Sequence, residues 1–145
     1  RLSHSKSDAD SSDYHFLMGE AFENDSQSAI ALEHYATAAR LAPSDGLKVA
    51  RYARSIAQQK SPGRGIRLMH AAYRSHQEDP AVVDQVVQGL VEQGRYDEAE
   101  LVITQALYHH PGDKRFLRIR DRFRAQRIED KLFGRAKGSD GPSHV

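Results

Sequence analysis

The feature that most constrains this chain is a repeat of 34 residues. When Ser12, Gly46 and Pro80 are aligned, residues of matching size fall at the same positions in three consecutive units. The twentieth position is small, the twenty-fourth is large and the twenty-seventh is alanine: Ala31, Gly65 and Ala99, then Tyr35, Met69 and Ile103, then Ala38, Ala72 and Ala106. Three ungapped repetitions predict similar units that stack on one another, because no such unit buries its apolar face alone.

Each unit is expected to contain two helices, because apolar residues recur at steps of three and four residues. Helices are expected at 12–24, 28–41, 46–59, 62–76, 80–93, 96–109 and 113–133. The small residues allow two antiparallel helices to approach, and the large ones fill the space between turns. Gly94 is free to end a helix in a left-handed conformation. Four expected N-caps precede helices: Ser44 or Asp45, Ser61, Asp79 and Asp113.

The run Gly94-Arg95-Tyr96-Asp97-Glu98-Ala99, followed by Ala106 and Pro111, resembles the second half of a tetratricopeptide repeat. Leu17-Met18-Gly19-Glu20-Ala21-Phe22 with Ala31, Tyr35, Ala38 and Pro43 resembles a whole repeat. The resemblance covers about 12–111. It implies an all-α, right-handed superhelical solenoid made of three helical hairpins.

The resulting domain prediction is a tetratricopeptide-repeat domain at 12–133, with repeats at 12–45, 46–79 and 80–113. Residues 114–133 do not form a fourth repeat and are expected to be a capping helix, apolar inward and charged outward. The expected apolar stripe consists of Phe116, Leu117, Ile119, Phe123, Ile128, Leu132 and Phe133. The ends, 1–11 and 134–145, are rich in Ser, Asp, Gly and His and are predicted to be flexible tails.

Composition fits one elongated helical domain of 145 residues, of which 39% are hydrophobic and 28% charged. The chain has no cysteine, which excludes disulfides and thiolate metal sites and leaves the compartment open. It has no apolar run of the roughly 18 residues that a membrane span requires. Its first residue is Arg1 rather than Met, which indicates a fragment or a processed form of a larger protein or assembly.

No pattern for catalysis or metal binding stands out, so we expect a non-catalytic chain without a cofactor or metal. The eight histidines include no pair at i, i+4 spacing, and the serines cluster in tails and caps. The run Ser61-Pro62-Gly63-Arg64-Gly65 lacks the lysine and the preceding strand of a phosphate loop, so it is interpreted as a turn.

Charge is distributed unevenly along the chain, although the net charge is only +1. Residues 1–45 hold three basic and eight acidic side chains, whereas residues 113–137 hold ten basic and four acidic ones. The arginine-rich segment 114–124 is compatible with a solvated helix face, an acidic partner, an anionic membrane surface or nucleic acid. The near-zero net charge argues against general binding of nucleic acid.

What the resemblance implies for binding is a concave groove lined by the first helix of each repeat. Carried onto this chain, the candidate groove residues are Phe16, Glu20, Glu23, Asn24, Arg51, Arg54, Gln58, Asp84, Gln88, Arg118 and Arg122. One subfamily grips the C-terminal carboxylate of chaperone tails through lysine and asparagine. Phe16 and Glu20 stand at those positions here, which excludes that ligand.

The function expected from these features is that of a scaffold or adaptor, which holds an extended or helical segment of a protein partner in the groove. The alternative is a self-assembling structural module, in which the acidic first repeat of one copy meets the basic capping helix of the next. The sequence does not name the partner, the pathway or the compartment.

Overall fold

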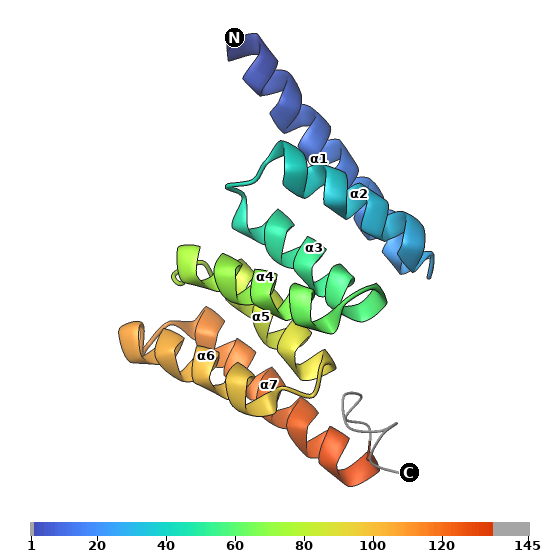
Figure 1. The fold of residues 1–145 in the computed structure, drawn as a ribbon. Helices are drawn as coiled ribbons and strands as arrows, with labels where there is room; N and C mark the ends of the chain where they lie inside the picture. Colours follow the sequence, from blue (N-terminus) through green and yellow to red (C-terminus); the bar gives the residue numbers. More distant parts are fainter. Residues whose placement is uncertain (1, 135–145) are drawn as a thin grey trace. The chain divides into compact units, whose positions relative to one another are not determined.

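The computed structural model describes residues 2–134, which fold into seven α-helices (Figure 1). Their bounds are α1 Leu2–Asn24, α2 Ser28–Leu41, α3 Gly46–Gln59, α4 Pro62–Ser75, α5 Pro80–Glu92, α6 Tyr96–His109 and α7 Lys114–Phe133. Every predicted helix is present, and from α2 onward each boundary lies within one residue of its predicted place. No strand occurs among these residues, so the prediction of an all-α fold is confirmed.

Helix α1 is longer than predicted, because it begins at Leu2 rather than near residue 12. The predicted start of the first helix at residue 12 is therefore wrong, while the domain boundary at residue 12 stays a prediction. No proline or glycine interrupts this stretch, and its Ser and Asp residues weaken a helix by only a few tenths of a kcal/mol each. Ser12 lies inside the helix, fully buried, and donates a hydrogen bond of 2.8 Å to the carbonyl oxygen of Ala38. Of the predicted tail at 134–145, all but Gly134 lies outside the described residues.

The predicted helix caps are confirmed. Asp45, rather than Ser44, accepts a hydrogen bond from the backbone N–H of Lys48 at the start of α3. Asp79 caps α5 and Asp113 caps α7 in the same way, and the Ser61 hydroxyl accepts from the backbone N–H of Arg64. Each bond satisfies a backbone donor that the helix itself cannot pair. Gly94 has a φ of 74°, the left-handed conformation expected where α5 ends.

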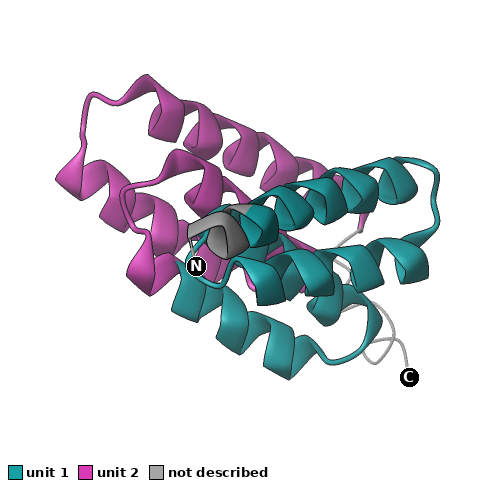
Figure 2. Cartoon of the chain, turned by 90° about the horizontal axis from the view of Figure 1, so that it is seen from above, with its two compact units in different colours: residues 1–72 teal, residues 73–145 magenta. Residues whose placement is uncertain are grey.

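The chain divides into two compact units, residues 1–72 and residues 73–145, with the boundary inside α4 (Figure 2). Unit 1 contains α1, α2, α3 and most of α4. Unit 2 contains the last turn of α4 together with α5, α6 and α7. Each unit has buried apolar side chains of its own.

The core of unit 1 depends on small residues at close helix contacts. Tyr35 and Ala38 of α2 are fully buried. A Cβ added to Gly19 of α1 would lie 2.6 Å from the Tyr35 ring, and one added to Gly65 of α4 would lie 2.5 Å from the backbone nitrogen of Ala57. Both distances are far shorter than carbon contacts of about 3.5–4.0 Å. The predicted role of small residues is therefore confirmed at these two positions.

The core of unit 2 consists mostly of branched and aromatic side chains, and its last helix is only partly covered. Phe116, Ile119 and Phe123 of α7 are buried, as the capping prediction required. Ile128, Leu132 and Phe133 of α7 are instead 59%, 73% and 69% exposed, so the prediction that they face inward is wrong.

The length of α7 accounts for two of these three side chains, Leu132 and Phe133. Asp130 accepts a hydrogen bond from the hydroxyl of Tyr96, the first residue of α6. Leu132 and Phe133 follow Asp130 in α7, beyond its contact with the first residue of α6. Among residues 2–134, no helix is both long enough and apolar enough to cross a membrane.

Candidate functional site

The predicted groove residues of unit 1 gather around Arg51, which α3 places against α1 and α2. Its Nη1 atom donates to Glu20 Oε2 at 3.2 Å and to the Tyr35 hydroxyl at 3.2 Å. Its guanidinium also lies 5.1 Å from the centroid of the Phe16 ring, within the range of a cation–π contact. The Arg51 side chain is only 15% exposed. This arginine therefore holds three helices of unit 1 together, a role that the groove prediction did not assign to it.

Glu23 is engaged in the same cluster. It accepts a hydrogen bond of 2.6 Å from the Tyr35 hydroxyl. Burial and this bond to a carboxylate raise the pKa of Tyr35, so its hydroxyl keeps the proton that it donates. Four of the predicted groove residues are thus brought together, bound largely to one another and to Tyr35: Phe16, Glu20, Glu23 and Arg51.

The other predicted residues of unit 1 differ from this cluster. Asn24 and Gln58 are exposed at the ends of α1 and α3. Arg54 is half-buried and already has an interaction within the chain. Unit 1 therefore presents few of its predicted groove charges to a partner.

Unit 2 contains a hollow of about 340 Å³ between α5 and α7, which we call the arginine pocket. Its lining residues are Pro80, Ala81, Asp84, Arg115, Arg118, Ile119 and Arg122. Three of them were predicted groove residues: Asp84, Arg118 and Arg122. The fourth predicted residue of this unit, Gln88, is half-buried on α5 and does not line the pocket.

The charges of the arginine pocket are unequal, with three guanidinium groups and one carboxylate. Arg122 Nη2 pairs with Asp84 Oδ1 at 3.0 Å, and Arg115 Nη2 pairs with Asp113 Oδ2 at 2.8 Å. Arg118 is exposed and forms no ion pair with any residue in 2–134. A planar guanidinium with free N–H donors favours a carboxylate, which it binds through two parallel hydrogen bonds.

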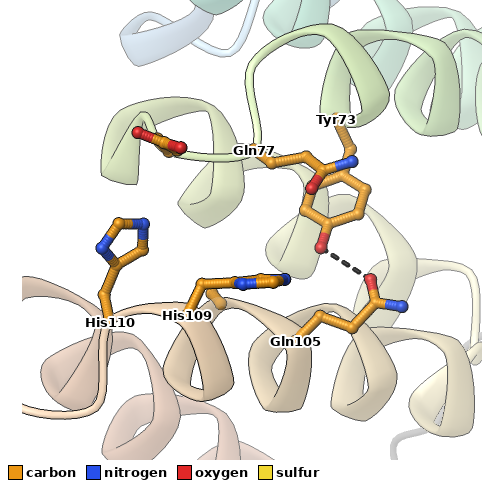
Figure 3. Close-up of a pocket in the computed structure, with 7 residues that line it drawn as sticks. Tyr73, Gln77, Gln105, His109 and His110 are labelled. Carbon is orange, nitrogen blue, oxygen red and sulfur yellow. Dashed lines mark hydrogen bonds between the residues drawn. The ribbon is translucent and has the colours of Figure 1, made fainter.

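A second hollow in unit 2, of about 100 Å³, lies beside the end of α6 (Figure 3). The Tyr73 hydroxyl donates to Gln105 Oε1 at 2.8 Å across it, and burial raises the pKa of Tyr73. His110 stacks on Phe116, with ring centroids 5.6 Å apart, and its buried Nε2 has no hydrogen-bond partner among the described residues. The adjacent positions of His109 and His110 in the sequence gave no indication of this hollow.

The chain was compared with known proteins. No protein-family model matches it, and no curated protein matches its sequence. Among solved structures, the Arabidopsis OM64 TPR domain is similar, with a TM-score of 0.60 at 17% sequence identity, over 82% of this chain and 98% of that chain. The fold is that of a tetratricopeptide-repeat domain. This agrees with the resemblance carried by the run at 94–99.

Three members of the arginine pocket were predicted as groove residues, and four were not: Pro80, Ala81, Arg115 and Ile119. Arg115 lies in the arginine-rich segment 114–124, so the sequence indicated its charge. The sequence did not indicate that Arg115 lines the pocket. Ile119 was expected only as a core residue, and it is indeed buried, at 4% exposure. Its contribution to the pocket is an apolar floor, which no charge pattern reveals.

Proposed function

We propose that this chain is a non-catalytic adaptor whose arginine pocket binds an acidic stretch of a partner polypeptide. The observation that carries the proposal is Arg118, an exposed guanidinium without an ion pair among the described residues, in a hollow that holds two more arginines. Tetratricopeptide-repeat folds typically serve as interaction modules, which supports a polypeptide as the ligand.

The partner's acidic side chain is expected to lie over Arg118 and its apolar neighbour over Ile119. The hollow of about 340 Å³ has room for a few side chains and not for a folded domain. Asp84 already forms an ion pair with Arg122. Arg118 therefore supplies most of the positive charge that the pocket leaves without a counter-charge. Such a contact is exposed to solvent, so it weakens as ionic strength rises.

The experiment compares Arg118→Glu with Arg124→Glu. Both substitutions change the net charge by the same amount. Arg124 is a matched control because it lies exposed on the same helix and does not line the pocket. Random peptides would be selected by display on the immobilised wild-type chain. The recovered peptides would then be measured against each variant.

We expect the selected peptides to be rich in Asp and Glu. Arg118→Glu should weaken their binding about tenfold or more, and Arg124→Glu should leave it nearly unchanged. Equal losses in both variants would show only a general effect of charge and would refute the pocket assignment. Selection of peptides without acidic residues would refute the ligand class.

Self-assembly is the competing function, since the basic face of α7 has an acidic counterpart near the start of the chain. Light scattering at rising salt concentrations separates the two. A wild-type chain that stays monomeric at low ionic strength supports the adaptor. If the chain forms a salt-sensitive oligomer and Arg118→Glu dissociates it, the pocket binds a second copy of the chain and the adaptor proposal is refuted.

A further inference from the structure

Two histidines meet across the first helical hairpin, far from the arginine pocket in sequence. His15 lies on α1 and His34 on α2, and their Nδ1 atoms are 2.9 Å apart. This distance is a hydrogen bond, so one ring donates from Nδ1 and the other accepts at the same atom. Both side chains are half-buried, which leaves one side of the pair open to solvent.

Neighbouring aromatic rings hold the pair in position. Phe22 stacks on His34 with ring centroids 5.5 Å apart and planes within 5°. The edge of Tyr14 lies against His15 at 5.2 Å, and the two imidazoles are themselves 5.1 Å apart at an interplanar angle of 30°. The two Nδ1 atoms are therefore preorganised, and little conformational entropy remains to be lost when a ligand binds both.

The separation of the two nitrogens fits a metal ion. Imidazole nitrogens bind divalent transition metals at about 2.0–2.1 Å. Two such bonds at a right angle, as in a square-planar centre, place their nitrogens about 2.9 Å apart. A tetrahedral angle would require a wider separation of about 3.3 Å. The observed 2.9 Å is the length of the hydrogen bond itself and is compatible with two bonds to one ion. Copper is the divalent first-row metal that binds a given nitrogen site most tightly.

We propose that His15 and His34 form a chelating pair for Cu²⁺ or Ni²⁺ that joins α1 to α2. Binding replaces the shared hydrogen bond by two metal–nitrogen bonds. The ring that donated moves its proton from Nδ1 to Nε2, so a neutral pair binds the ion without net loss of a proton.

The remaining coordination positions belong to water or to a donor from outside the chain. Within residues 2–134, no group of three or more His, Cys, Asp or Glu side chains is arranged to hold a metal ion. A site with two protein ligands binds less tightly than the closed four-ligand sites of structural metals. It also remains open to a further ligand.

The test uses copper alone, added as Cu²⁺ to the whole chain, with His15→Gln and His34→Gln as the variants. Glutamine keeps a polar side chain of similar size. The matched control is His109→Gln, an exposed histidine of unit 2. Calorimetry measures affinity, and electron paramagnetic resonance counts the nitrogen ligands.

We expect two imidazole nitrogens on the copper bound to the wild type and to the control. Each of the two hairpin variants should lose one nitrogen and bind copper about tenfold or more weakly. Copper should also raise the melting temperature of the wild type but not of the hairpin variants, because binding to the folded state alone stabilises it.

Circular dichroism shows whether each variant folds. If a variant folds poorly, a copper titration of the wild-type chain in urea provides a second test. In urea that unfolds the wild-type chain, His15 and His34 separate, so the affinity for copper should fall by a similar factor. Unchanged affinity in urea, or copper bound equally by the wild type and both hairpin variants, would mean adventitious binding at other histidines and would overturn the proposal.

Discussion

The arginines at the predicted groove positions differ between the two units. In unit 1, the side chain of Arg51 is 15% exposed and contacts an acidic residue and two aromatic rings. In unit 2, the side chain of Arg122 is 61% exposed and forms one ion pair, with Asp84. Arg118 beside it has no ion pair within 2–134. The same residue type therefore stabilises the fold in one unit and faces solvent in the other.

Burial explains this difference. An enclosed guanidinium is screened little by water, so its hydrogen bonds and its contact with an aromatic face stabilise the folded state. An exposed guanidinium gains almost nothing from a single surface ion pair. Of the three groove arginines compared, the two exposed ones in unit 2 keep donors for a partner, and this is why the proposed site lies there and not around Arg51.

The largest expected effect concerns the tight packing of unit 1. Gly65→Ala places a methyl group 2.5 Å from the backbone of Ala57, where no side-chain rotation relieves the clash. We expect a loss of about 3 kcal/mol in the free energy of unfolding, measured by urea denaturation. The control is Gly112→Ala in unit 2, whose added Cβ meets no atom within 4 Å and should change stability by less than about 0.5 kcal/mol. Equal effects of the two substitutions would contradict the packing described for unit 1.

A smaller effect tests the two arginines directly. Arg51→Met removes the bonds to Glu20 and Tyr35 and should lower the free energy of unfolding by about 2 kcal/mol. Arg122→Met removes one exposed ion pair and should cost less than about 0.5 kcal/mol. Urea midpoints of both variants, taken at equal m-values, measure the contrast. If Arg122→Met were as costly as Arg51→Met, the assignment of one arginine to the fold and the other to binding would be wrong.

The sequence predicted the helices and their caps because those features depend on local chemistry. Proline at Pro80, the carboxylates at Asp79 and Asp113, and a left-handed glycine at Gly94 each act within one turn of chain. The start of α1 was predicted wrongly because the prediction relied on polar composition rather than on a local start or stop signal. Residues 2–11 contain no proline or glycine to end a helix, and a polar composition alone does not prevent one.

The side-chain networks were beyond prediction because they join residues that are distant in sequence. Arg51 was identified as a groove residue, yet its partner Glu20 is 31 positions away and nothing in the sequence pairs them. His15 and His34 are 19 positions apart, so a search for histidines one helical turn apart does not find them. The exposure of Ile128 and Leu132 was missed because a periodic apolar stripe does not show whether a second helix covers it.

The smallest expected effect concerns the cap of α7 at the edge of the arginine pocket. Arg115 donates to Asp113 from its side chain, at 2.8 Å from Nη2, and from its backbone N–H, also at 2.8 Å. These bonds lower the pKa of Asp113 from 3.8 to about 2. Because the folded-state pKa is the lower one, the stabilisation is present above pH 3.8 and is lost as the pH falls toward 2.

Arg115→Ala removes the side-chain donors and keeps the backbone donor. The pKa of Asp113 should therefore rise only part of the way back to 3.8, as a carboxyl titration followed by NMR would measure. Arg124→Ala, on the same helix and outside the pocket, should leave it unchanged. A pKa of Asp113 that stays near 2 without the Arg115 side chain would show that the backbone bond alone holds the carboxylate. Arg115 would then be free for a partner's carboxylate, and the arginine pocket would hold two available guanidinium groups instead of one.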